Sequence, residues 1–130
     1  MGQKAALTIS EAEWQIMEVV WRAADPMPSE EILRQVENRS DWSESTMRTF
    51  LNRLGKKGAI CAVREGRRYL YSPACQREEC LRHESTAFLK RYFDGKLSPM
   101  LACFLGEESI SEEELDRLEE LVKRRKKELS

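Results

Sequence analysis

Apolar and polar positions recur with helical spacing along most of this chain. The segment from Ser43 to Gly58 shows this most clearly, because Met47, Leu51 and Leu54 stand at i, i+4 and i+7. That spacing places the three side chains on one face of a helix and predicts that this face is buried. Ser43 can cap the start of the helix, and Gly58 can close its end.

The opposite face of the same segment is polar and basic. Serine, threonine, asparagine and arginine side chains bond phosphate oxygens and base edges, and an arginine can hold guanine O6 and N7 with two parallel hydrogen bonds. This composition predicts a DNA recognition helix. Its polar members are Ser45, Thr46, Arg48, Thr49, Asn52 and Arg53, followed by Lys56.

Two short strands are predicted directly after this helix. Residues 59–63 form a short apolar run, Gly66 can adopt the positive φ of a turn, and residues 67–71 have the composition of a second strand. A hairpin in this position, with a basic tip, is typical of a winged helix-turn-helix, whose wing lies along the DNA backbone. The basic residues of the tip are Arg64, Arg67 and Arg68.

Two helices are predicted before the recognition helix. Ser10 and Glu13 have the spacing of a capping box, and the helix behind it should end near Ala23. Ser29 is predicted to cap the second helix, and residues 38–42 to form the turn that follows it. The expected core positions of the two helices are Trp14, Met17, Val20, Trp21, Ile32, Leu33 and Val36.

Three apolar helices are predicted after the hairpin. The first is expected from Ser72 and Pro73 to about Asp94, the second from Ser98 and Pro99, and the third after a capping box at residues 111–114. Short helices with this much apolar surface cannot bury their faces on each other alone, which predicts a dimerisation arm. The expected contact residues are Leu81, Phe88, Leu89, Tyr92, Phe93, Leu101, Phe104, Leu105, Leu115, Leu118, Leu121 and Val122.

The fold class expected from these elements is mainly α with a small β-hairpin wing. Residues 1–72 would form a winged helix-turn-helix domain, and residues 73–130 a three-helix dimerisation domain. A chain of 130 residues with 41% hydrophobic and 35% charged residues suits such a pair of small units, and a soluble cytoplasmic protein. No apolar run approaches the roughly 20 residues that cross a bilayer, and residues 1–8 lack the apolar core of a secretory signal.

The charges are distributed unevenly. Residues 43–72 contain seven basic and two acidic residues, a net charge of +5, whereas the whole chain carries −1, so the remaining residues carry −6. Most charge runs are only solvated surface. Here the basic segment coincides with the predicted helix and wing, which favours double-stranded DNA as the partner.

Candidate metal and catalytic residues are few. Cys61, Cys75, Cys80 and Cys103 form no closely spaced pair, and His83 adjoins none of them, so neither a metal nor another cofactor is expected. These cysteines are expected to be small buried or half-buried residues in a reducing cytosol, and their spacing gives no support for redox sensing. A single histidine without a nucleophile partner, and no glycine-rich phosphate loop, predict that the protein is not an enzyme.

Several motifs together resemble the penicillinase-repressor family, known as BlaI/MecI/CopY. The resemblance implies a homodimeric repressor that binds a palindromic operator and controls β-lactam resistance or, in the CopY branch, copper export. The motifs are residues 9–14, Val20-Trp21, residues 41–43, residues 46–49, Arg53-Leu54 with residues 56–58, and residues 71–73.

Two departures from the family pattern refine this expectation. The copper-responsive branch carries a CxCxxxxCxC cluster near its end, and none follows Cys103, which disfavours copper sensing. In the β-lactam branch, the resemblance implies that a membrane sensor-protease inactivates the repressor by cutting an Asn-Phe bond. The matching position is Cys103-Phe104, where the phenylalanine is kept and the asparagine is not.

The expected function is therefore that of a repressor occupying a promoter. Base edges or flanking phosphates would be met by Ser45, Thr46, Arg48 and Thr49, while Asn52, Arg53, Lys56, Arg67 and Arg68 would mainly position the duplex. Two alternatives stay open. The winged fold could bind an acidic protein as an anti-activator, or the repressor could respond to a small ligand or to cysteine modification.

Overall fold

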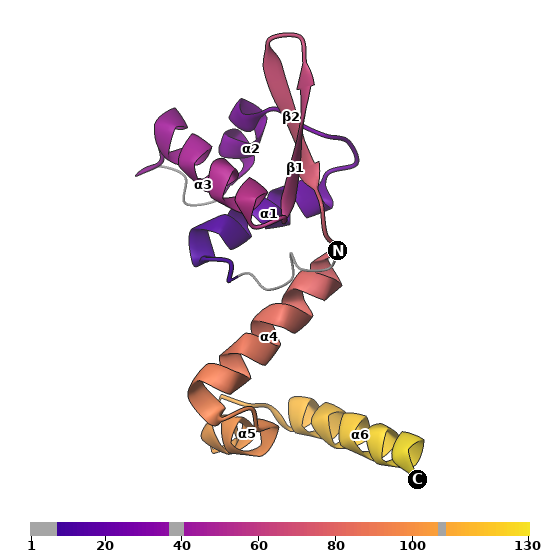
Figure 1. Cartoon of the computed structure of the whole chain (residues 1–130). Helices are drawn as coiled ribbons and strands as arrows, with labels where there is room; N and C mark the ends of the chain where they lie inside the picture. The colour runs from indigo at the N-terminus through magenta and orange to yellow at the C-terminus, as the bar shows by residue number, and fades with distance from the viewer. Residues whose placement is uncertain (1–7, 37–40, 107–108) are drawn as a thin grey trace. The chain divides into compact units, whose positions relative to one another are not determined.

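The computed structural model describes residues 8–36, 41–106 and 109–130, which form two compact units, 1–87 and 88–130. They are mainly helical with one antiparallel hairpin, as predicted (Figure 1). Of the predicted turn at 38–42, residues 38–40 lie outside the described residues. The elements are α1 (Glu11–Arg22), α2 (Ser29–Gln35), α3 (Glu44–Lys56), β1 (Ile60–Glu65), β2 (Arg68–Pro73), α4 (Arg77–Phe93), α5 (Leu97–Leu105) and α6 (Glu112–Leu129).

Three helices begin where the sequence predicts a cap. Ser10 Oγ accepts from the Glu13 backbone N–H at 3.2 Å, and the Glu13 carboxylate accepts from the Ser10 N–H at 2.9 Å, so the capping box of α1 is complete. Ser43 caps α3 by accepting from the Thr46 N–H at 3.1 Å, and Ser111 caps α6 in the same way. Each cap satisfies backbone donors that have no partner within the helix.

The core of the first unit contains Met17, Val20, Ile32 and Val36 as predicted, but Ile16 and Val19 of α1, which were not predicted, are equally buried. Residues from α1, α2, α3 and β1 pack into one apolar cluster, and Trp14 and Trp21 lie against it with their rings edge to face, 5.2 Å apart. Both tryptophans are therefore packing residues, as predicted. The largest of the fully buried apolar side chains are Ile16, Met17, Val19, Val20, Ile32, Met47 and Leu54.

The hairpin is longer than predicted and is fixed at its base. Its strands pair from Ile60 opposite Pro73 to Glu65 opposite Arg68, and Gly66 in the turn adopts φ +67°, the conformation for which glycine is suited. Met27, between α1 and α2, exchanges two backbone hydrogen bonds with Tyr71, at 3.0 and 2.8 Å. No local pattern indicated this bridge, which holds the wing against the helices.

Three predicted helix starts were wrong. Pro28 and not Ser29 occupies the cap position of α2, and Lys96 occupies that of α5, which begins at Leu97. The helix expected from Pro73 begins at Arg77, because the ladder of the hairpin continues to Pro73. Strand pairing with β1 outweighs the local preference of proline for a first helical turn.

The first unit continues into α4. Cys80 is 8% exposed and belongs to the core, and the Glu84 carboxylate accepts from the Ile9 N–H at 2.9 Å. The division of function at residue 72 stays a prediction, while these contacts connect the start of α4 with the helices of the first unit.

The helices α5 and α6 of the second unit bury none of their described side chains. Tyr92 is 62% exposed, Phe104 50% and Val122 52%, although all three are large and apolar. Among the described residues, no helix combines the length and the apolarity needed to cross a membrane. The predicted contact residues of the dimerisation arm are thus exposed or half-buried in the single chain.

The expectation for the cysteines was partly wrong. Cys75 and Cys80 are half-buried and buried as expected, but they are paired as a disulfide. Cys61 and Cys103 are free and exposed. Within the described ranges no three histidine, cysteine or acidic side chains are grouped so that they could hold a metal ion.

Candidate nucleic-acid interface

Helix α3, the predicted recognition helix, presents its polar stripe to solvent because its apolar stripe is held in the core. Met47, Leu51 and Leu54 are all at most 2% exposed. The predicted DNA-binding side chains of this helix are exposed, apart from the half-buried Thr46. The exposed set is Ser43, Ser45, Arg48, Thr49, Asn52, Arg53 and Lys56.

Several hydroxyl groups of this stripe are already engaged within the helix. Ser43 Oγ caps the helix and lies 3.1 Å from Thr46 Oγ1, and Thr49 Oγ1 donates to the Ser45 carbonyl at 3.1 Å. These hydroxyls keep lone pairs but have fewer free donors for phosphate or bases. The long cationic side chain of Arg48 is therefore the strongest candidate for a base contact in the first half of α3.

Arg48 and two wing arginines border one hollow, which we call the Arg48 groove. It has a volume of about 280 Å³ and lies between α2, α3 and β2. Arg48 belongs to the helix, whereas Arg67 and Arg68 come from the hairpin, so residues 19 positions apart or more are brought together. Glu30 and Glu44 also border it and limit its positive charge; the rest of the lining is Ser29, Leu33, Met47, Leu51, Tyr69 and Tyr71.

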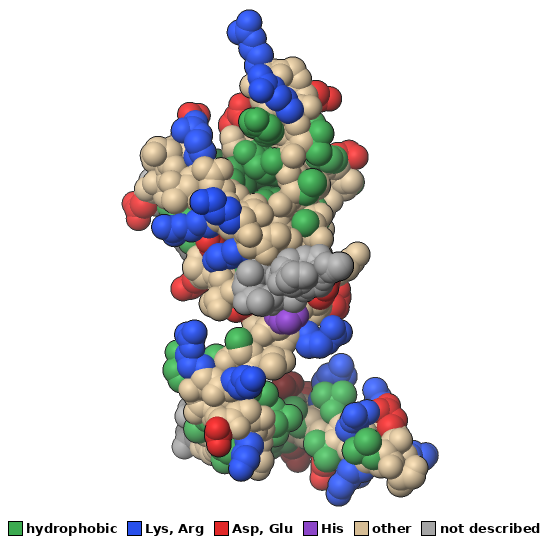
Figure 2. Space-filling model, in the orientation of Figure 1, with side chains coloured by type: hydrophobic (Ala, Val, Ile, Leu, Met, Phe, Trp, Pro, Cys, Tyr) green, Lys and Arg blue, Asp and Glu red, His purple; other side chains and the backbone are tan. Residues whose placement is uncertain are grey.

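A second hollow, the Lys56 groove, lies along the later part of α3. It has a volume of about 570 Å³ and is bordered by Asn52 and Lys56 from the helix and by Ala62 from β1. Leu51, Tyr69 and Tyr71 border both grooves, which therefore follow the line where α3 meets the hairpin. Figure 2 shows basic side chains at the hairpin tip and over α3 on one face of the first unit.

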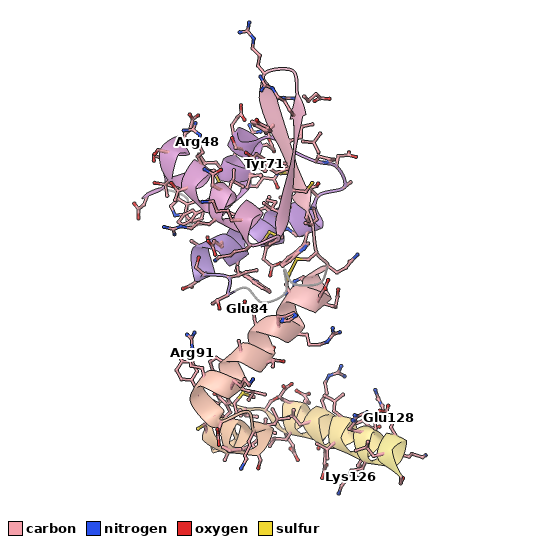
Figure 3. The ribbon with its side chains drawn as sticks, viewed as in Figure 1. Arg48, Tyr71, Glu84, Arg91, Lys126 and Glu128 are labelled. Atoms are coloured by element: carbon pink, nitrogen blue, oxygen red, sulfur yellow. A yellow bond between two sulfur atoms is a disulfide. The ribbon has the colours of Figure 1, made fainter. Side chains whose placement is uncertain are left out.

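Tyr69 and Tyr71 were not among the predicted site residues. Figure 3 shows Arg48 on α3 and Tyr71 on the side of the hairpin that faces this helix. Burial raises the pKa of Tyr71, and Tyr69 adds to the rise, while the charge of Arg48 opposes it. Tyr71 is therefore a protonated hydrogen-bond donor at neutral pH. The alternation of side chains along a strand, which puts residues 69 and 71 on one face, could have indicated both tyrosines.

Arg64 contributes differently from the other wing arginines. Its Nε donates to the Gly66 carbonyl at 3.1 Å, and its guanidinium lies 5.9 Å from the centre of the Tyr69 ring. These contacts stiffen the wing tip, although the side chain stays exposed. Neither groove is bordered by Ser43, Ser45, Thr46, Thr49, Arg53 or Arg64.

The end of α3 is tied to α1 by a partly buried ion pair. Lys57 Nζ lies 2.5 Å from Glu13 Oε1 and also donates to the Thr8 carbonyl at 2.6 Å. Glu13 is only 1% exposed. Burial alone would raise the pKa of Glu13, but the hydrogen bonds from Lys57 and Ser10 and the charge of Lys57 lower it overall. Lys57 thus orients the recognition helix and is not part of its exposed basic face.

The arrangement suits an extended polyanion better than a small ligand. Both grooves are open to solvent. The cations of the Arg48 groove come from α3 and from the hairpin, and that of the Lys56 groove comes from α3. A helix of this kind fits the major groove of duplex DNA, and wing arginines can contact adjacent phosphates.

Comparisons with known proteins agree with this geometry. The family model described as penicillinase repressor matches residues 9–124. The penicillinase repressor of Bacillus licheniformis is 35% identical over 123 residues, which cover 92% of this chain and 95% of that protein. The methicillin resistance regulatory protein MecI of Staphylococcus aureus (strain N315) is 25% identical over 117 residues, 90% and 94% of the two chains. The solution structure of the DNA-binding domain of the repressor BlaI has a TM-score of 0.50 and 34% identity, covering 57% of this chain and 89% of that one.

Proposed function

The chain belongs to the penicillinase repressor family, and we propose that it is a DNA-binding transcriptional repressor without catalytic activity. The observation that carries the proposal is the convergence of Arg48 with Arg67 and Arg68 on one groove. In this proposal α3 enters the major groove, the wing follows the phosphates, and the bound protein blocks a promoter.

The direct test is binding to fluorescently labelled duplex DNA of random sequence at low salt. A DNA-binding protein keeps substantial nonspecific affinity there, and that affinity falls steeply as salt is added. The absence of such binding would instead favour a winged-helix module that docks an acidic protein partner. An operator can then be selected from a pool of random duplexes with the full-length protein.

Arg48→Ala is expected to reduce operator affinity by about 1 to 3 kcal/mol and to relax the preference at one base pair of each half-site. The side chain is exposed, so the fold should persist. Fluorescence anisotropy with operator variants measures the preference. Arg53→Ala is the matched control, since a phosphate contact should weaken all sequences alike. An unchanged preference at every base pair would remove Arg48 from base recognition.

Replacing Arg67 and Arg68 together by alanine should weaken specific and nonspecific DNA binding about equally. Binding releases fewer counterions when phosphate contacts are missing. The magnitude of the slope of log K against log salt should therefore decrease by roughly 1 to 2. Titrations at several salt concentrations give the slope. The charge-matched control replaces Arg117 and Arg124 on α6, which removes two positive charges outside the wing. Equal slopes for the wing variant and the unmodified protein would mean that the wing does not contact DNA.

We further propose a homodimer on a palindromic operator. The second unit leaves Phe88, Tyr92 and Phe104 each at least 45% exposed, more apolar surface than short helices can leave in water as a monomer. A two-fold dimer would bury these faces against each other and place two recognition helices about 34 to 36 Å apart, or a multiple of that spacing.

Release by proteolysis at Cys103-Phe104, through a membrane sensor-protease, is the proposed induction route. The relatives named penicillinase repressor and methicillin resistance regulator suggest an operon for β-lactam resistance or a related stress. Both residues of the bond are exposed and lie in the last turns of α5. A protease would need to unwind the end of this helix, where local opening costs least.

A chain truncated after Cys103 is expected to bind a full operator hardly better than a half-site. It lacks α6 and with it the apolar residues Leu115, Leu118 and Val122, so the link between two half-sites should be lost. Anisotropy titrations with full and half operators compare the two affinities, with the intact chain as control. If the truncated chain dimerises and binds the full operator as tightly as the intact one, a small ligand or cysteine modification becomes the better hypothesis.

A further inference from the structure

Two cysteines that form no recognised metal-binding or redox motif meet at the start of α4. Cys75 lies between β2 and α4, Cys80 lies in the first turns of α4, and the two form a disulfide with Cα atoms 6.9 Å apart. Cys80 is 8% exposed, whereas Cys75 is half-buried and packs against the edge of the core. The pair therefore combines one half-buried and one buried cysteine.

We propose that Cys75 and Cys80 form a reversible thiol–disulfide site, oxidised by a peroxide, that stiffens the junction between the winged helix and α4. A DNA-binding protein works in a reducing compartment, where disulfides are mostly transient and regulatory. This part of the reasoning, and the consequence for operator binding below, rest on the proposed function. The pairing of the two sulfurs rests on their placement in the fold.

The fold can also accommodate the two cysteines in their reduced form. Cys75 Sγ lies 3.9 Å from the Ala59 carbonyl, a distance at which a thiol is a weak donor. The same carbonyl accepts from the Ala74 N–H at 2.9 Å, which fixes it next to the sulfur. Cys75 can therefore exchange its bond with Cys80 for a contact with Ala59 without a large backbone movement.

The disulfide lies beside the contacts that connect the start of α4 with α1. Trp21 Nε1 of α1 donates to the Cys75 carbonyl at 3.0 Å, and Arg77 at the start of α4 pairs with Glu18 of α1 at 3.2 Å. The ion pair is solvent-exposed and contributes little by itself. A covalent bond from Cys75 to Cys80 spans Arg77 and would restrain the first turn of α4 beyond what these contacts achieve.

The chemistry balances with hydrogen peroxide as the oxidant. The Cys75 thiolate attacks one peroxide oxygen, an S–O bond forms, the O–O bond breaks, and the leaving hydroxide takes up a proton as water. The Cys80 thiol then loses its proton and attacks the sulfenic sulfur of Cys75. The S–S bond forms, the S–O bond breaks and a second water leaves, so two electrons pass from the sulfurs to the peroxide. A dithiol reductant reverses the reaction.

The first test uses the full-length chain with Cys61→Ser and Cys103→Ser, so that only the pair can react. After treatment with hydrogen peroxide, mass spectrometry should show the loss of two hydrogens within one chain. Because Cys80 is buried, alkylation is carried out on the denatured chain, where both cysteines should react only after dithiothreitol is added. Adding Cys75→Ser to this background is the matched control, in which Cys80 should stay available to alkylation. Alkylation of both thiols after peroxide, or bonds formed only between chains, would overturn the proposal.

The second test measures the junction itself. Backbone hydrogen exchange of residues 80–83, the first amides of α4 with acceptors in the helix, should be slower in the oxidised chain than in the reduced one. The Cys75→Ser control should show no difference. A stiffer junction should also raise the ratio of full-operator to half-operator affinity, by roughly three- to tenfold. Equal exchange in the two redox states would refute the stiffening. Absence of operator binding in both states, with the exchange difference intact, would refute the proposed function instead.

Discussion

Leu118→Asp is expected to convert the protein from a dimer into a monomer and to lower its affinity for a full operator by roughly 10²- to 10⁴-fold. Leu118 is half-buried in the single chain and lies on the apolar side of α6 with Leu115 and Val122. In a dimer interface the new carboxylate would be buried without a partner, at a cost that the interface cannot offset. Phe88→Asp on α4 should act in the same way.

Sedimentation and anisotropy distinguish this effect from misfolding. The affinity of Leu118→Asp for a half-operator should equal that of the unmodified protein, because the winged helix has its own core. Glu120→Ala, on the opposite side of α6, is the matched control and should leave the dimer intact. Sedimentation of the unmodified protein as a monomer at micromolar concentration would contradict the dimer.

Glu13→Gln is expected to destabilise the winged helix by about 2 to 3 kcal/mol. Glutamine can keep the capping box with Ser10, so the variant isolates the loss of charge beside Lys57. This expected loss of stability is smaller than that for breaking a fully buried ion pair, because the Lys57 side chain is 26% exposed and can be hydrated again. Urea denaturation at pH 7 measures the change in the free energy of unfolding.

Two further variants separate the ion pair from packing. Lys57→Met should leave Glu13 charged and buried and should cost at least as much as Glu13→Gln. The double variant should recover part of the loss, because neither charge is then left without its partner. Additive effects of the two substitutions would show that the pair contributes no coupling energy.

The contribution of Glu13 to the free energy of unfolding should decrease at acidic pH. The pKa of Glu13 is lowered on folding from its ordinary value of 4.5, so its stabilisation is complete above that value and is lost as pH falls through the lower folded pKa. Glu18, whose pKa is lowered chiefly by its hydrogen bond from Arg77, adds to the same acid loss. The difference in stability between the unmodified protein and Glu13→Gln should therefore narrow below pH 4.5. A constant difference across this range would exclude Glu13 as the titrating group.

Much of the proposed interface could be predicted from local sequence. The apolar stripe of Met47, Leu51 and Leu54 is buried as its spacing requires, and Ser43 and Gly66 adopt the conformations expected of a cap and a turn. Helical spacing, caps and tight turns depend on residues within four positions of each other. Their physical basis is contained in the segment itself.

Errors arose where a distant partner competed with a local preference. Pro73 suits a first helical turn, yet it lies opposite Ile60 in the hairpin, and α4 starts only at Arg77. No local pattern predicted the bridge from Tyr71 to Met27, which lies 44 positions earlier. Nor did any predict that Tyr71 borders both grooves. Pairing between strands and loops is decided by packing of the whole unit.

Periodicity, charge and motif order were enough to predict the winged-helix architecture, the basic face of α3 and the family. The pairing of Lys57 with Glu13 and of Cys75 with Cys80 could be recognised only in the folded chain. Glu13 and Lys57 are 44 positions apart, so their contact exists only once α1 and α3 have packed together. The cysteines meet because the chain turns from β2 into α4 between them. Local sequence fixes which groups are available, and packing fixes which of them touch.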